Sequence, residues 1–252
     1  MASQGMHSPV EQFEIRPLIE LNAGGYDISF TNSSLFMLLA IVVSGIFLVT
    51  AMRQGELVPG RMQGAAEMMY EFVADMVRSN VGSEGRAYFP FIFTLFAFLL
   101  FGNMLGLIPY SYTFTSQIIV TFFMAAFVFV GVTVIALFKH GMHFFSFFVP
   151  AGAPKVLIPF LIVIEVISYF VRPVSLSVRL FANMLAGHTM LKVFAGLAVM
   201  ISGAGGIAMA GSLLPFLALI GLTGLEVLVA ALQAYVFTIL TCMYLNDALH
   251  LH

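Results

Sequence analysis

The sequence contains no tryptophan and a single cysteine, Cys242, and charged side chains are scarce. One cysteine cannot form an intramolecular disulfide, so a disulfide-stapled secreted domain is excluded. Only 9% of the 252 residues are charged, whereas soluble domains carry roughly 25%. A surface that faces water on every side cannot be built from so few charges. Because 61% of the residues are hydrophobic, the composition predicts an integral membrane protein solvated largely by the lipid bilayer.

The ten lysine and arginine residues nearly balance the twelve aspartate and glutamate residues, which gives a formal net charge of −2. A nucleic-acid-binding protein carries a basic excess, so nucleic acid is not an expected partner. The N-terminal stretch is polar and mixed in charge, which argues against a cleavable signal peptide. We therefore expect residues 1–33 to form a polar segment that precedes a retained membrane helix.

Three apolar runs in the first part of the chain come close to the length needed to cross a bilayer. They cover Leu35–Met52, Ala87–Ile108 and Ser116–Phe138, and about 20 residues cross ~30 Å of hydrocarbon. A backbone in lipid must satisfy its own hydrogen bonds, so these segments are predicted as helices.

Two further segments are predicted to be amphipathic or interfacial. Pro59–Arg78 has apolar residues at helical spacing and an acidic stripe on the other side, which indicates an amphipathic helix that lies at the interface or packs against other spans. The alternative is an ordinary solvated helix with one apolar side. The apolar face consists of Met62, Ala65, Met69, Phe72, Val73 and Met76. The phenylalanine-rich stretch His140–Pro150 is the second interfacial element.

A long apolar region, 154–249, follows and is interrupted by glycines within 203–211, which predict the turn of a helical hairpin. The first arm, 154–200, would be roughly 70 Å long as one helix, about twice the ~30 Å of hydrocarbon. It is therefore expected to be steeply tilted, kinked near Pro159 or Pro173, or split. The second arm raises the same problem.

These segments predict an all-α integral membrane protein with about five transmembrane helices, an amphipathic interfacial helix and a long, tilted hairpin at the end. We expect one membrane domain over 1–252, in which 34–150 holds the first three spans and the interfacial helices. Basic residues concentrate in the loops 53–86 and 139–155, which two spans separate. The positive-inside rule makes that side cytoplasmic and leaves the N-terminus outside.

Several charged residues lie inside the hairpin, where each costs at least ~2.5–3.5 kcal/mol at a helix centre. The first arm contains Glu165, Arg172, Arg179 and Lys192, and the second contains Glu226. The first three follow one another at intervals of seven residues, which aligns them on one helix face. Charges kept in lipid at this cost indicate a functional site.

Polar residues extend these stripes. Asn183 continues the Arg179 face one turn later, whereas His188 is nine residues from Arg179 and lies on roughly the opposite face. On the second arm, Glu226 and Gln233 are seven residues apart and share one face. The hairpin therefore has ordered polar stripes.

Arginine stays protonated, with a pKa above ~12, so Arg179 cannot relay protons in the ordinary way. It can act as a fixed positive charge that attracts a carboxylate and repels a passing cation. Glu165, His188 and Glu226 can gain and lose protons. We therefore expect a proton path on both sides of a fixed cation, formed by the hairpin 154–249.

Structural roles stay open for these residues. The long side chains of Arg172 and Lys192 can reach the interface, and Glu165 can pair with Arg172. His188 and Glu226 can bridge the two arms, which would not exclude proton transfer. For Arg179 the alternative is an ion pair inside the protein.

The run 172–188, Arg-Pro-Val-Ser-Leu-Ser-Val-Arg-Leu-Phe-Ala-Asn-Met-Leu-Ala-Gly-His, resembles subunit a of the F-type ATP synthases. The run 226–237 is similar to that family's last helix, and the motifs at 102–104 and 107–109 fit an earlier span. The resemblance extends over nearly the whole chain, and its Arg-Leu-Phe-x-Asn core is highly specific.

In that family the subunit is the membrane stator beside a rotating ring of c subunits, so the resemblance implies proton translocation by a non-catalytic subunit. It assigns Arg179 as the arginine that faces the ring carboxylates. It assigns the half-channel open to the outside to Asn183, His188, Glu226 and Gln233. It assigns the cytoplasmic exit to Glu165, Ser168 and Ser175, and Arg172 is included in the proton path.

The sequence departs from some members of the family. Some bacterial members have glutamate where this chain has His188 and histidine where it has Glu226. The swap keeps one imidazole and one carboxylate across the hairpin, so the proton path is still expected. Some members have an aspartate at the position of Gly106, and no role is assigned there.

The resemblance also implies partners and a location. The expected partners are the c-subunit ring, peripheral-stalk subunits of b type, other ATP synthase subunits and the lipid bilayer, with no cofactor and no metal. The expected location is a bacterial plasma (inner) membrane, with the mitochondrial inner membrane as the alternative. The sequence also allows two other functions: a self-contained transporter or channel, and a structural membrane anchor.

Overall fold

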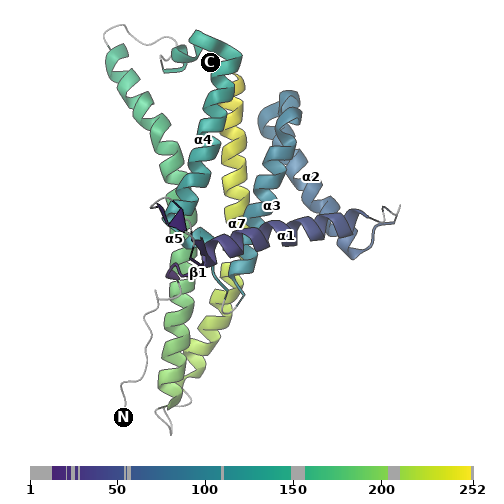
Figure 1. The fold of residues 1–252 in the computed structure, drawn as a ribbon, viewed down its shortest axis with the longest axis vertical. Helices are drawn as coiled ribbons and strands as arrows, with labels where there is room; N and C mark the ends of the chain where they lie inside the picture. Colours follow the sequence, from purple (N-terminus) through teal and green to yellow (C-terminus); the bar gives the residue numbers. More distant parts are fainter. Residues whose placement is uncertain are drawn as a thin grey trace. The chain divides into compact units, whose positions relative to one another are not determined.

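The computed structural model describes residues 13–20, 22–23, 26–27, 29–53, 55, 58–108, 111–148, 157–203 and 211–250. Helices dominate these residues (Figure 1). Within the described ranges, five helical segments are long and apolar enough to cross a membrane: Asn32–Met52, Arg61–Gly106, Ile118–Phe144, Ile158–Gly203 and Leu213–Leu249. The prediction of an all-α membrane protein is confirmed.

The first three predicted spans are helices whose ends differ from the prediction by a few residues. They are α1 (Asn32–Met52), α3 (Phe89–Gly106) and α4 (Ile118–His140). The amphipathic segment is α2 (Arg61–Val81), which continues through the short helix η2 (Gly82–Tyr88) into α3. After α4, the phenylalanine-rich stretch forms η4 (Gly141–Phe148). The chain between α3 and α4 contains η3 (Phe114–Ser116).

Among the described residues, four short strands precede α1, and the sequence did not predict them. β1 (Pro17–Ile19) pairs antiparallel with β4 (Phe30–Thr31), and β2 (Asn22–Ala23) pairs antiparallel with β3 (Tyr26–Asp27). They lie in the polar N-terminal segment, where Thr31 and Ser34 are joined at the start of α1 by hydroxyl groups 3.3 Å apart.

The two arms of the predicted hairpin are α5 (Ile158–Gly203, 46 residues) and α7 (Leu213–Leu249, 37 residues). Pro159 lies in the first turn of α5, where a missing amide hydrogen costs little. Pro173 lies inside the helix, yet α5 continues past it, so splitting of this arm is ruled out. Most of the predicted turn lies outside the described residues, as does the predicted start of the first arm.

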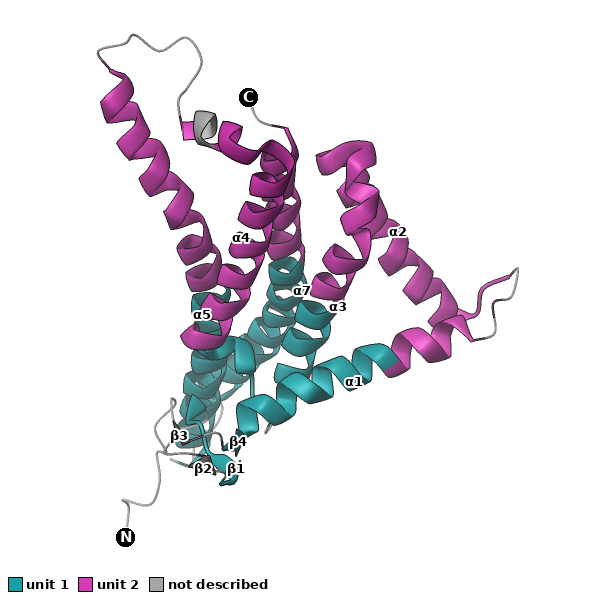
Figure 2. Cartoon of the chain, turned by 45° about the horizontal axis from the view of Figure 1, so that its top comes forward, with its two compact units in different colours: residues 1–45, 98–117, 180–234 teal, residues 46–97, 118–179, 235–252 magenta. Residues whose placement is uncertain are grey.

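The chain packs into two compact units (Figure 2). Unit 1 comprises residues 1–45, 98–117 and 180–234, and unit 2 comprises residues 46–97, 118–179 and 235–252. The helices α1, α3, α5 and α7 each begin in one unit and continue into the other. The expectation of one membrane domain over the whole chain stays a prediction.

Helix α2 packs against α3 in unit 2. Tyr70 on α2 meets the edge of the Phe89 ring, with 4.8 Å between ring centroids. Of the predicted apolar face, only Val73 and Met76 are buried. The complete buried set is Ala66, Val73, Met76, Val77 and Val81. The buried face of α2 is therefore rotated about the helix axis from the predicted apolar face, because packing against α3 determines which residues are buried.

The end of α4 is tied to two other elements of unit 2. Lys139 forms an ion pair with Glu84 in η2. The ring nitrogen Nε2 of His140 lies 3.1 Å from the backbone carbonyl oxygen of Ala248 near the end of α7. These contacts fix the C-terminal ends of α4 and α7 within the unit.

In unit 1 the chain that follows α3 folds back onto that helix. Phe114 is 1% exposed, and its ring lies where a side chain at position 102 would project. The ring of Phe98 is its neighbour, with centroids 5.2 Å apart. Gly102 is therefore required for the close approach of this connection to α3.

We expect Gly102→Ala to destabilise the protein by about 1–3 kcal/mol, because the added methyl group collides with the Phe114 ring. Gly131→Ala is the matched control, since nothing lies within 4 Å of a side chain at that helical position. The temperature at which half of the detergent-solubilised protein aggregates should fall for the first variant and not for the second. Equal midpoints would contradict the packing argument.

Candidate functional site

The histidine and glutamate predicted on the two hairpin arms meet in unit 1. Nδ1 of His188 on α5 lies 3.3 Å from Oε1 of Glu226 on α7, and the side chains are 12% and 6% exposed. Gly187 permits this approach, because a Cβ atom there would lie 2.8 Å from the same glutamate oxygen. Of the arrangements that the sequence left open, the structure contains the bridge between the arms.

The Glu226 carboxylate depends on His188 for its charge balance. Neither carboxylate oxygen has a hydrogen-bond partner within the described residues, and a buried anion without donors is costly. The pair can exist as an imidazole beside a carboxylic acid or as an imidazolium beside a carboxylate. Both arrangements contain one proton more than a neutral imidazole beside a carboxylate, so the pair can accept that proton on one side and release it on the other.

Buried polar side chains of α3 and of the chain that follows it contact the pair and the neighbouring turn of α7. Oγ1 of Thr113 lies 2.9 Å from Nε2 of His188. The hydroxyl of Thr115 donates to Oδ1 of Asn103 over 2.9 Å. Nδ2 of Asn103 donates in turn to the carbonyl oxygen of Ala230 on α7 over 3.2 Å. This network fixes α7 one helical turn beyond the glutamate.

The sequence did not predict Asn103, Thr113 and Thr115 as site residues. All three are buried. A signal was present, because an asparagine inside an apolar span is costly unless it is hydrogen-bonded. Its partners come from distant parts of the chain, so they could not be identified without the fold.

The two remaining residues of the predicted outer half-channel differ in exposure. Gln233 on α7 is 8% exposed and shares the buried face of Glu226, as its spacing predicted. Asn183 on α5 is exposed. The polar stripe of the second arm is therefore an internal face, whereas Asn183 lies on the surface.

Arg179 is exposed on α5, and it makes no ion pair with a carboxylate in the part of the chain that the structure describes. The alternative of an ion pair inside the protein therefore does not hold among the described residues. Ser168 and Ser175 precede it on the same helix face and are also exposed. A permanent positive charge on this face is accessible to a carboxylate of another protein.

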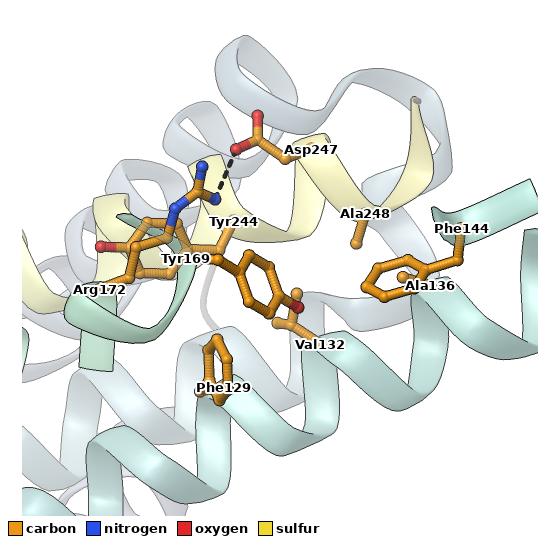
Figure 3. Close-up of a pocket in the computed structure, with 9 residues that line it drawn as sticks. All are labelled: Phe129, Val132, Ala136, Phe144, Tyr169, Arg172, Tyr244, Asp247 and Ala248. Atoms are coloured by element: carbon orange, nitrogen blue, oxygen red, sulfur yellow. Dashed lines mark hydrogen bonds and ion pairs between the residues drawn. The ribbon is translucent and has the colours of Figure 1, made fainter. Parts of the chain in front are cut away.

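Arg172 pairs with Asp247, a partner that the sequence did not predict. Its Nη1 donates to Oδ2 of Asp247 near the end of α7 over 2.9 Å, and its side chain is 22% exposed. The guanidinium carbon lies 5.6 Å from the ring centroid of Tyr169 and 5.3 Å from that of Tyr244 (Figure 3). Glu165 forms no hydrogen bond or ion pair within the described residues, so Arg172 is held by Asp247 instead.

Lys192 is exposed on α5, which agrees with a long side chain that reaches outwards. In the described part of the chain, no group of three or more histidine, cysteine, aspartate or glutamate side chains could hold a metal ion. The buried His188–Glu226 pair can exchange protons, and the exposed Arg179 can attract a charged partner.

Comparisons with known proteins identify the family. The family model described as ATP synthase A chain matches residues 34–246. ATP synthase subunit a of Rhodospirillum rubrum is 56% identical over 247 residues, which are 98% of this chain and 100% of the relative. The same subunit of Parvibaculum lavamentivorans is 56% identical over 242 residues, 96% of this chain and 93% of the relative. That of Mesorhizobium japonicum is 54% identical over 242 residues, 96% of each chain. The chain belongs to the family of ATP synthase subunit a.

Proposed function

We propose that Arg179 is the fixed charge that separates two proton half-channels where this chain meets a ring of c subunits. Membership of the family gives the general function, which is proton translocation as the stator of the membrane sector of a rotary ATP synthase. Other subunits of that synthase are therefore its partners. The observation that carries the proposal is the exposed position of Arg179, without a carboxylate partner among the described residues.

Electrostatics supports a role for this charge at the ring. Two unit charges about 4 Å apart interact by ~4 kcal/mol at an effective dielectric constant near ~20. That interaction is strong enough to favour an ionised ring carboxylate beside Arg179 and weak enough to let it leave. Because arginine does not lose its proton, the same group repels a proton that would cross directly between the half-channels.

The outer half-channel is formed by Asn183, His188, Glu226 and Gln233. The main observation in favour of this half-channel is the buried contact between His188 and Glu226. These two side chains can bind one proton between them and pass it on. A proton that enters from outside reaches this pair and then neutralises a ring carboxylate. The neutral carboxylic acid can turn into lipid at little cost, whereas the anion cannot.

The inner half-channel is formed by Glu165, Ser168 and Ser175, with Arg172 beside it. Ser168 and Ser175 are exposed on the helix face that also carries Arg179. A ring carboxylic acid that arrives from the lipid loses its proton to this path and is then held as an anion by Arg179. A proton-motive force thereby becomes torque, and ATP is made elsewhere in the complex, so this subunit is not itself a catalyst.

The c-subunit ring and the b-type subunits of the peripheral stalk are the proposed neighbours, in a bacterial plasma membrane. The named relatives are bacterial, which supports this location over a mitochondrial membrane. A self-contained transporter would move its substrate as the purified chain alone. The proposed mechanism instead requires the ring carboxylates.

Replacing Arg179 with alanine should abolish ATP-driven proton pumping in membranes that hold the whole complex, because no charge then separates the half-channels. ATP hydrolysis by the soluble part should persist. Quenching of a pH-sensitive dye by inverted vesicles measures the pumping. Arg78→Ala is the matched control, since Arg78 is an exposed arginine on α2 that pairs only with Asp75 over 3.7 Å among the described residues, and it should pump normally. Normal pumping by Arg179→Ala would overturn the mechanism.

Exchanging the two members of the buried pair should preserve part of the activity. Glu226→Gln or His188→Ala alone should slow pumping by about a hundredfold, the lower range for loss of an acid–base group. The double variant His188→Glu with Glu226→His keeps an imidazole beside a carboxylate and should pump faster than either single variant. Initial rates of dye quenching, scaled to the amount of assembled complex, give the comparison. A double variant as slow as the single variants would argue against transfer within the pair.

A further inference from the structure

We infer that Thr113 is a positioning residue for proton transfer, because its hydroxyl determines which nitrogen of His188 presents a lone pair to Glu226. The inference rests on the proposed function, since it assigns a role to Thr113 only if protons pass through His188. It deepens that function by explaining how the buried pair is kept in an orientation that can exchange a proton.

The Thr113 side chain is held between two partners. It is 4% exposed, and its Oγ1 donates to the backbone carbonyl of Gly106 over 3.2 Å. The same oxygen lies 2.9 Å from Nε2 of His188. A hydroxyl group has one hydrogen and two lone pairs. When that hydrogen is committed to the carbonyl, the oxygen can only accept, so Nε2 of His188 must carry the hydrogen of the second bond.

This assignment fixes the tautomer of the neutral ring. A neutral imidazole carries one N–H group, and if Nε2 holds it, Nδ1 has a lone pair. Nδ1 is the nitrogen that faces Oε1 of Glu226 at 3.3 Å. A proton on the Glu226 carboxyl group can then move to Nδ1: the O–H bond breaks, an N–H bond forms, and a carboxylate and an imidazolium result. The reverse step restores the neutral pair.

Gly106 makes room for this arrangement. A Cβ atom at position 106 would lie 2.6 Å from Oγ1 and 2.7 Å from Cγ2 of Thr113, so any side chain there would displace the threonine. The position at which the family resemblance assigned no role therefore has one in this chain. It admits the threonine whose hydroxyl reaches His188.

The test is ATP-driven pumping by the whole ATP synthase in inverted membrane vesicles, scaled to the amount of assembled complex. Thr113→Val keeps the shape of the side chain but removes the hydroxyl, and it should slow pumping by about tenfold, which is less than the roughly hundredfold expected when an acid–base group itself is lost. Thr113→Ser keeps the hydroxyl and should pump within about twofold of the unaltered enzyme. Thr113→Ala removes the hydroxyl without a branched replacement and should resemble the valine variant.

Thr241→Val is the matched control. Thr241 is 1% exposed, and its hydroxyl donates to the Phe237 carbonyl of its own helix over 2.9 Å. Because this bond lies outside the proposed path, the control should pump normally.

The measured pumping rates test the role of Thr113 separately from the proposed proton path through His188. Full pumping by both Thr113→Val and Thr113→Ala would overturn the inference, and so would a serine variant as slow as the valine variant, because packing would then be the cause. In either case His188→Ala should still be slow, and the proposed path would stand. If His188→Ala itself pumps normally, the proposed path fails, and the inference fails with it.

Discussion

The high cost of an ionised group in hydrocarbon governs the organisation of this chain. Three charged residues of the hairpin, Glu226, Arg172 and Arg179, offset that cost in different ways. His188 and Glu226 lie 3.3 Å apart and can share one proton, and Arg172 is paired with Asp247 and flanked by two tyrosine rings. Arg179 has no carboxylate partner among the described residues, so the compensation for its charge is proposed to come from another subunit.

Glycine residues allow side chains of the site to approach the neighbouring helices closely. Gly187 lets the Glu226 carboxylate reach α5, and Gly102 and Gly106 let Phe114 and Thr113 fold back against α3. In water a loose polar contact can be completed by solvent, whereas in lipid an incomplete contact leaves a buried polar group unsatisfied. The glycines therefore stabilise the site indirectly, because they remove the side chains that would keep its partners apart.

The sequence predicted the helices well because lipid imposes a length and a composition on each span. It also predicted that Glu226 and Gln233 share a face, since helical periodicity needs no knowledge of neighbours. It did not predict Asp247 as the partner of Arg172 or Thr113 as the partner of His188, because both pairs join residues 75 positions apart. The face that α2 buries was predicted with the wrong rotation, since packing against α3 decides it.

The length of α5 has a further consequence. A helix of 46 residues is about 69 Å long; if it stays within ~30 Å of hydrocarbon, it must incline by roughly 65° from the membrane normal. Most of its length then runs along the membrane plane. The 11 residue steps from Ser168 to Arg179 correspond to ~16 Å along the helix axis, most of it parallel to the membrane plane. If the proposed ring of c subunits turns past such a helix, each ring carboxylate meets these residues one after another, in chain order or in its reverse.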